Sequence, residues 1–148
     1  MHGKRCFFIG HREAAKEILP ALERAIEQHI SYGVTEFIAG HYGGFDALAA
    51  QTVMRAKQQH PQITLVLLLP YHPAERLPDD TAGFDSTFYP PDMEKVPRRL
   101  SIVRANRYMV DHADYLIAYA RHPASNARAL AEYAQKREKQ GLITVTML

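Results

Sequence analysis

The sequence predicts an α/β fold: one domain of three layers, in which helices cover both faces of a parallel sheet. Apolar, strand-like runs alternate along the chain with segments of helical periodicity. That alternation is typical of parallel strands joined by right-handed helical crossovers. The length of 148 residues fits a single folding unit with a sizeable core. We therefore expect residues 1–148 to form one domain.

The elements follow from the apolar pattern. Five runs are predicted as buried strands, at 5–9, 35–39, 63–69, 114–120 and 143–147. Four segments with helical spacing are predicted as helices, at 13–31, 44–59, 102–112 and 124–140. Pro20 is predicted to begin the main part of the first helix, and Gly33 and Gly141 to end the first and last helices. Ser125 or Asn126 is the expected N-cap of the last helix.

Residues 70–97 interrupt the alternation. This stretch holds six prolines, and no helix crosses such a stretch intact. It predicts a long irregular excursion with a short strand at 86–89. A loop of this length in a small domain is usually functional or mobile.

Composition excludes several classes of protein. Apolar residues make up 47% of the chain, which is typical of a globular protein. The formal net charge is only +2, so we expect no nucleic-acid partner. No apolar run approaches the ~18 residues of a membrane span, and the apolar run near the amino terminus is too short for a signal peptide. With Cys6 as the only cysteine, no internal disulfide is expected, and the cytoplasm is the expected location.

A histidine follows each of four predicted strands, and we expect these loops to meet at the carboxyl edge of the sheet. The four are His11, His41, His72 and His122. Open α/β sheets bind ligands at that edge, so we expect the site there. Protonated histidines would then strengthen phosphate binding as the pH falls from 8 to 6. Their spacing does not match a zinc motif, so no metal and no other cofactor is expected.

A glycine-rich loop lies between the second strand and the second helix. Gly40, His41, Gly43, Gly44 and Asp46 stand at 40–46. Glycines let a backbone approach a ligand closely, and the start of a helix presents free N–H groups, so this loop is our main candidate for a phosphate site. The alternative is a tight turn with Asp46 as a helix cap.

Two further segments supply candidate ligand groups. Gly10, His11 and Arg12 end the first strand, where a guanidinium either holds an anion or pairs with a carboxylate on the surface. In the helix at 102–112, Arg107 and Asp111 are spaced to pair with each other. That pairing leaves Asn106, a poor helix former, as a residue that points at the site.

These segments together resemble the SLOG superfamily, and most closely its YpsA-like (DUF1273-type) branch of bacterial proteins. The resemblance covers nearly the whole chain. It rests on residues 6–12 (CFFIGHR), 33–40 (GVTEFIAG), 44–46 (GFD) with Ala49 and Ala50, 69–71 (LPY) and 106–111 (NRYMVD). It implies a Rossmann-like sheet of order 3-2-1-4-5 and a site for a nucleotide or ADP-ribose-like ligand at the carboxyl edge. It also implies homo-oligomers.

Two departures from the family pattern bear on function. The family's phosphate-binding Gly-Gly-Thr turn is replaced by His122-Pro-Ala-Ser-Asn-Ala127, where only Ser125 and Asn126 offer polar side chains. The family's arginine before Asn106 is replaced by Ala105, with Arg104 beside it. The Pro-Gly-Gly-x-Gly-Thr-x-x-Glu motif of the related phosphoribohydrolases is also missing. These departures count against catalysis more than they count against ligand binding.

Three functions remain open at this point. The favoured one is a sensor or regulatory protein that binds a nucleotide-derived phosphate ligand without catalysis. The second is an N-glycosidase acting on nucleoside monophosphates, with Asp46, Asp111, Glu132 or a histidine as the acid or base. The third is a protein-interaction module whose pocket has decayed.

Overall fold

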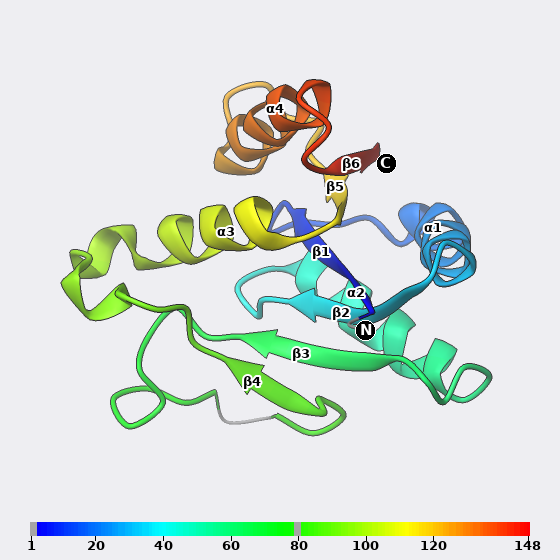
Figure 1. Ribbon diagram of the computed structural model, residues 1–148, viewed down its shortest axis with the longest axis horizontal. Helices are drawn as coiled ribbons and strands as arrows, with labels where there is room; N and C mark the ends of the chain where they lie inside the picture. The colour runs from blue at the N-terminus through cyan, green and yellow to red at the C-terminus, as the bar shows by residue number, and fades with distance from the viewer. Residues whose placement is uncertain (1–2, 79–80) are drawn as a thin grey trace.

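Six parallel strands form the central sheet (Figure 1). In the computed structural model, which describes residues 3–78 and 81–148, they are β1 (Lys4–Gly10), β2 (Val34–Ala39), β3 (Thr64–Leu68), β4 (Ser86–Phe88), β5 (Tyr115–Tyr119) and β6 (Thr144–Met147). Their order across the sheet is β4-β3-β2-β1-β5-β6. β1 therefore lies near the centre, with β2 and β5 as its neighbours.

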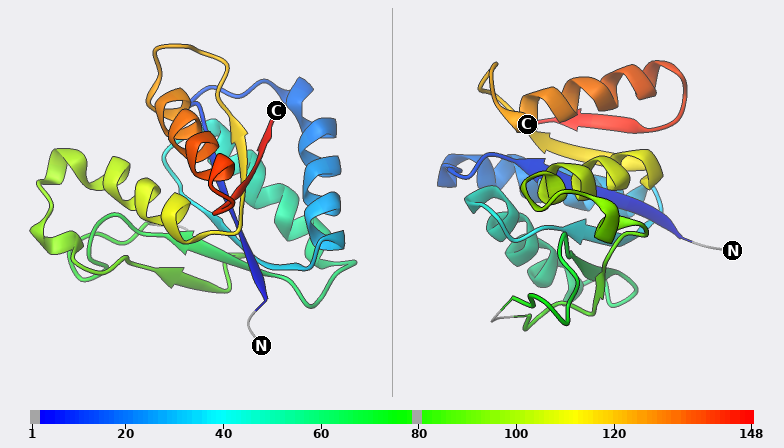
Figure 2. Two further views of the ribbon diagram at one scale, coloured as in Figure 1. Left: turned by 45° about the horizontal axis from the view of Figure 1, so that its top comes forward. Right: turned by 90° about the vertical axis from the view of Figure 1, so that its left-hand side faces the viewer.

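Four helices cover the two faces of this sheet. They are α1 (Leu19–Ser31), α2 (Gly44–Lys57), α3 (Ser101–His112) and α4 (Asn126–Lys139). Three short 3₁₀ turns, η1 (Lys16–Ile18), η2 (Met93–Lys95) and η3 (Arg98–Leu100), precede α1 and α3. α1 and α2 pack on one face, and α3 and α4 pack on the other (Figures 1 and 2). The predicted α/β class, with helices on both faces of a parallel sheet, is confirmed.

Side chains of β1 alternate between the two cores. Cys6 and Phe8 pack against α1 and α2, whereas Phe7 and Ile9 pack against α3 and α4. All four are almost completely buried. This is why the run is apolar at every position instead of alternating with polar residues.

The strand order differs from the predicted 3-2-1-4-5, because a sixth strand, β4, pairs with the outer edge of β3. Asp85 anchors it. The Asp85 carboxylate accepts a hydrogen bond from the Leu65 N–H (2.7 Å) and pairs with Lys57 (2.6 Å), while the Asp85 N–H donates to the Leu65 carbonyl (2.8 Å). The excursion at 70–97 thus contributes to the sheet as well as to its carboxyl edge.

Helix boundaries shift by a few residues from the predicted ones. α1 begins at Leu19 instead of residue 13, and Pro20 is its second residue, where a missing N–H costs nothing. Gly33 and Gly141 follow α1 and α4 with φ of +100° and +77°, a conformation that favours glycine. No helix among the described residues combines the length and apolar character needed to cross a bilayer.

Candidate functional site

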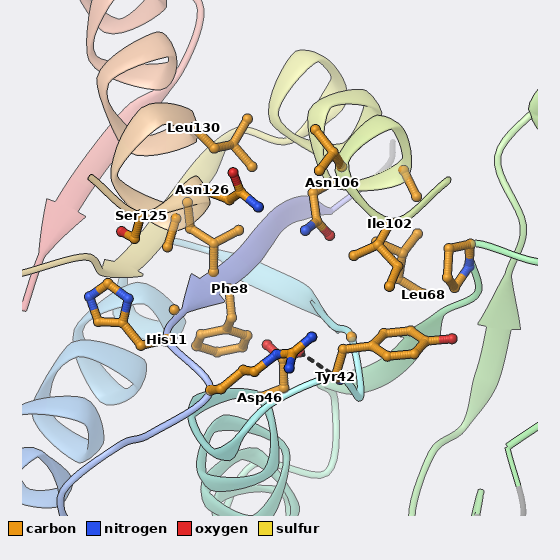
Figure 3. Close-up of a pocket in the computed structure, with 18 of the residues that line it drawn as sticks. Phe8, His11, Tyr42, Asp46, Leu68, Ile102, Asn106, Ser125, Asn126 and Leu130 are labelled. Carbon is orange, nitrogen blue, oxygen red and sulfur yellow. Dashed lines mark hydrogen bonds between the residues drawn. The ribbon is translucent and has the colours of Figure 1, made fainter. Parts of the chain in front are cut away.

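A cavity of about 440 Å³ opens at the carboxyl edge of the sheet (Figure 3). We call it the main cavity. Its walls come from the ends of β1, β2 and β3, from α3, and from the first turn of α4. Most of the predicted site residues line it: Gly10, His11, Arg12, Gly40, Asp46, Asn106, Ser125 and Asn126. Apolar side chains such as Leu68, Ile102 and Leu130 line the rest.

The glycines that begin α2 do not line the cavity. The Gly44 N–H donates to the Arg12 carbonyl (2.7 Å), and the Phe45 N–H donates to the His11 carbonyl (3.3 Å). A Cβ on Gly44 would lie 2.7 Å from the Arg12 oxygen, and one on Gly43 would lie 3.0 Å from the Arg12 Cα. Both glycines let two loops pack closely. This geometry disagrees with our prediction that they bind phosphate, because these helix-start amides already have acceptors.

The first two amides of α4 differ from those of Gly44 and Phe45 at the start of α2. Ser125 caps this helix, since its Oγ accepts from the Arg128 N–H (3.1 Å) and donates to the His122 carbonyl (2.8 Å). Across residues 3–78 and 81–148, the N–H groups of Asn126 and Ala127 have no acceptor. Both residues line the main cavity. An anion in the cavity would therefore face the partial positive charge of this helix terminus.

Asp46 lies on the opposite wall of the cavity from Asn126 (Figure 3). Burial raises the pKa of its carboxyl to about 6, although a hydrogen bond from the Tyr42 N–H (3.1 Å) acts in the opposite direction. A Cβ on Gly40 would lie 3.0 Å from the Asp46 Oδ2. Gly40 thus makes room for this carboxylate. A carboxylate that is costly to ionise, set in a cavity, is a common mark of a functional site.

His11 holds the backbone of a neighbouring loop in place and is not free to bind a ligand through its Nε2. Its side chain is buried, and its Nε2 accepts hydrogen bonds from the N–H groups of Arg121 (2.8 Å) and His122 (3.2 Å). Burial, and then the neighbouring His122, lower the pKa of His11. A neutral His11 therefore holds the loop between β5 and α4.

The predicted cluster of four histidines is not found in the main cavity. His11 lines it, but His41 lines a neighbouring cavity, and neither His72 nor His122 lines either one. Burial, and then the charge of Arg76, lower the pKa of His41. The expected histidine-driven pH dependence of phosphate binding is therefore not supported by the geometry.

Cationic and amide groups at the rim of the main cavity lack protein partners. In the part of the chain that the structure describes, the side chains of Arg12, Arg99 and Asn106 have no hydrogen bond or ion pair. Arg99 was missed at the sequence level, although its neighbour Arg98 and the preceding Pro97 marked a basic turn before the helix. Arg104, which was predicted as a ligand, is exposed outside the cavity.

Other carboxylates proposed for catalysis lie elsewhere. Asp111 accepts from the Tyr133 hydroxyl (2.6 Å) and pairs with Arg137 (3.5 Å), not with Arg107 as predicted. Glu132 pairs with Arg128 (3.8 Å), and neither Asp111 nor Glu132 lines the main cavity. Among the described residues, no group of three histidine, cysteine or acidic side chains is arranged to hold a metal ion.

Comparison with known proteins rests on structure alone. No protein-family model and no curated protein matches the sequence. DNA processing protein A (DprA) from Helicobacter pylori, studied for its single-stranded DNA binding mode, superposes with a TM-score of 0.64 at 17% identity. DprA from Streptococcus pneumoniae gives 0.68 at 18% identity, and the Moco carrier protein from Chlamydomonas reinhardtii gives 0.59 at 15%.

Each match covers almost all of this chain but only part of the other protein. The match spans 97% of this chain for both DprA proteins and 99% for the Moco carrier protein. It spans only 64% and 50% of the two DprA chains, and 76% of the Moco carrier protein.

The fold is Rossmann-like. At these identities the likeness shows the fold alone, and it fits the resemblance to the SLOG superfamily. It also corrects one prediction. We expected no nucleic-acid partner, but this fold occurs in a protein that binds single-stranded DNA. That exclusion was wrong, because net charge averages over the whole chain and does not describe the charge at one edge of the sheet.

Proposed function

We propose that the main cavity binds a nucleotide or nucleotide-derived ligand through its phosphate, and that the protein acts as a sensor or regulator of the YpsA-like type. One observation carries this proposal: among the described residues, two cations and two helix-start amides without protein partners belong to residues that line a single cavity. These groups are Arg12, Arg99, and the N–H groups of Asn126 and Ala127. Such donors suit an anion with several oxygens.

The rest of the cavity suits a sugar and a base. Asp46 and Asn106 offer an acceptor and an amide for ribose hydroxyls, and Leu68, Ile102 and Leu130 offer an apolar surface for a ring. A volume of about 440 Å³ lies within the usual range for small-ligand sites, roughly 300–1,000 Å³. These polar groups also count against a decayed pocket in an interaction module.

Catalysis by the same cavity is the second candidate, and Asp46 favours it. Its carboxyl pKa of about 6 lies close to neutral pH, as efficient general acid–base catalysis requires. Incubation with AMP and other nucleoside monophosphates should release free base if the protein is an N-glycosidase. Asp46→Asn should then abolish release. If the wild type releases no base, the site is one for binding only.

Calorimetric titration with AMP, ADP and ADP-ribose tests the binding proposal. Arg12→Gln and Arg99→Gln should each weaken binding about tenfold, because each removes a charged donor. Arg24→Gln is the matched control, since Arg24 is exposed on α1 and lines neither cavity at the carboxyl edge. The proposal fails if none of the three compounds binds, or if the two cavity variants bind as tightly as the control.

A further inference from the structure

A second cavity adjoins the main cavity. Its volume is about 590 Å³, and it lies between the loop after β2 and the first part of the excursion after β3. Tyr42 and Pro70 line both cavities and therefore form the boundary between them. A ligand that occupied both cavities would pass these two residues.

Arg76 gives the second cavity its charge. Its guanidinium lies 5.2 Å from the centre of the Tyr71 ring, and within the described ranges no carboxylate pairs with it. Arg98 lies at the same distance from that ring but is paired with Glu75. Arg76 is thus the cation of this pair that remains available to a ligand.

The other walls of the second cavity suit a ring. Leu77 lines it and is 52% exposed, which is high for a large apolar side chain. His41 also lines it, and its lowered pKa keeps the imidazole neutral beside Arg76. Among the described residues, the cavity therefore combines a cation without an acidic partner, an exposed apolar side chain and aromatic rings, a combination that suits the phosphate and base of a nucleotide.

We infer that the two cavities together bind two linked nucleotide units, with the second unit's phosphate on Arg76 and its base against Leu77 and Tyr42. This inference rests on the proposed function, because the first unit occupies the main cavity. A free dinucleotide and two consecutive nucleotides of a single strand offer this same chemistry. The ligand class is therefore defined by two nucleotide units rather than by one.

Calorimetric titrations with AMP, the dinucleotide pApA and a longer oligo(A) strand test the inference. pApA should bind at least about tenfold more tightly than AMP, because it gains a charged contact and an apolar one. Arg76→Gln should remove that advantage and leave AMP binding unchanged, whereas Arg24→Gln should change neither. A strand that binds more tightly than pApA identifies nucleic acid as the source, and equal affinities identify a free dinucleotide.

Two results would overturn the inference, and they are distinguishable. If AMP binds and pApA binds no more tightly, or if Arg76→Gln has no selective effect on pApA, the second cavity is not a subsite and the proposed function stands. If neither AMP nor pApA binds, the proposed function fails and the inference fails with it.

Discussion

Replacing Asp46 with asparagine is expected to stabilise the protein at neutral pH. Burial raises the pKa of this carboxyl from 3.8 to about 6, so the folded state binds the proton more tightly than the unfolded chain does. Stability is therefore lost as the pH rises from about 4 to above 6, where the folded protein must carry the buried charge. A difference of this size is worth about 3 kcal/mol. Asparagine removes the charge and keeps an oxygen to accept from the Tyr42 N–H.

Urea unfolding at a series of pH values measures this effect. Asp46→Asn should gain up to about 3 kcal/mol in the free energy of unfolding near pH 7.5 and almost nothing near pH 3, where the carboxyl is mostly protonated in both states. Glu13→Gln is the control, because Glu13 is exposed and its replacement should change little at any pH. A gain that does not vary with pH, or a loss near pH 7.5, would refute the reasoning about Asp46.

Three further predictions concern the framework of the site. Gly10→Ala should destabilise the protein by about 1–3 kcal/mol in urea unfolding, because a Cβ would overlap the buried Phe45 ring; an unchanged midpoint would contradict this packing. Asp85→Ala should cost about 1–3 kcal/mol and speed amide exchange in β4, since the Leu65 N–H loses its carboxylate acceptor; unchanged exchange would show that Asp85 does not anchor the strand. Burial lowers the pKa of His29, so thermal stability should fall as the pH drops below about 6.5, and His29→Phe should reduce that loss; an identical pH profile in the variant would disprove it.

Local signals made much of the fold predictable. The run at 6–9 is apolar at every position because its side chains enter two cores, and Ser125 stands where a helix needs a cap. The position of the site at the carboxyl edge followed from the alternation of strands and helices. The edge strand at Ser86–Phe88 is only three residues long, and Asp85, directly before it, anchors it to Leu65 and Lys57 from distant parts of the chain. Its place in the sheet was therefore not encoded locally.

The details of the site depend on tertiary contacts that a single sequence does not reveal. The amides that begin α2 looked free, but the carbonyls of His11 and Arg12 occupy them. His11 looked like a ligand group, but backbone amides use its Nε2. Arg99 reaches the main cavity from the turn before α3, after the long excursion. In each case the deciding contact joins residues far apart in the chain.

Backbone amide NMR during a titration with AMP tests the central claim most directly. The account predicts that the signals of Asn126 and Ala127 shift most, because these residues line the main cavity and their N–H groups have no acceptor in the part of the chain that the structure describes. The signals of Gly44 and Phe45 should move far less, since these amides already donate to carbonyls. Shifts centred on Gly44 and Phe45, shifts confined to α1 and β6, or no shifts at millimolar AMP would contradict a nucleotide site at the start of α4.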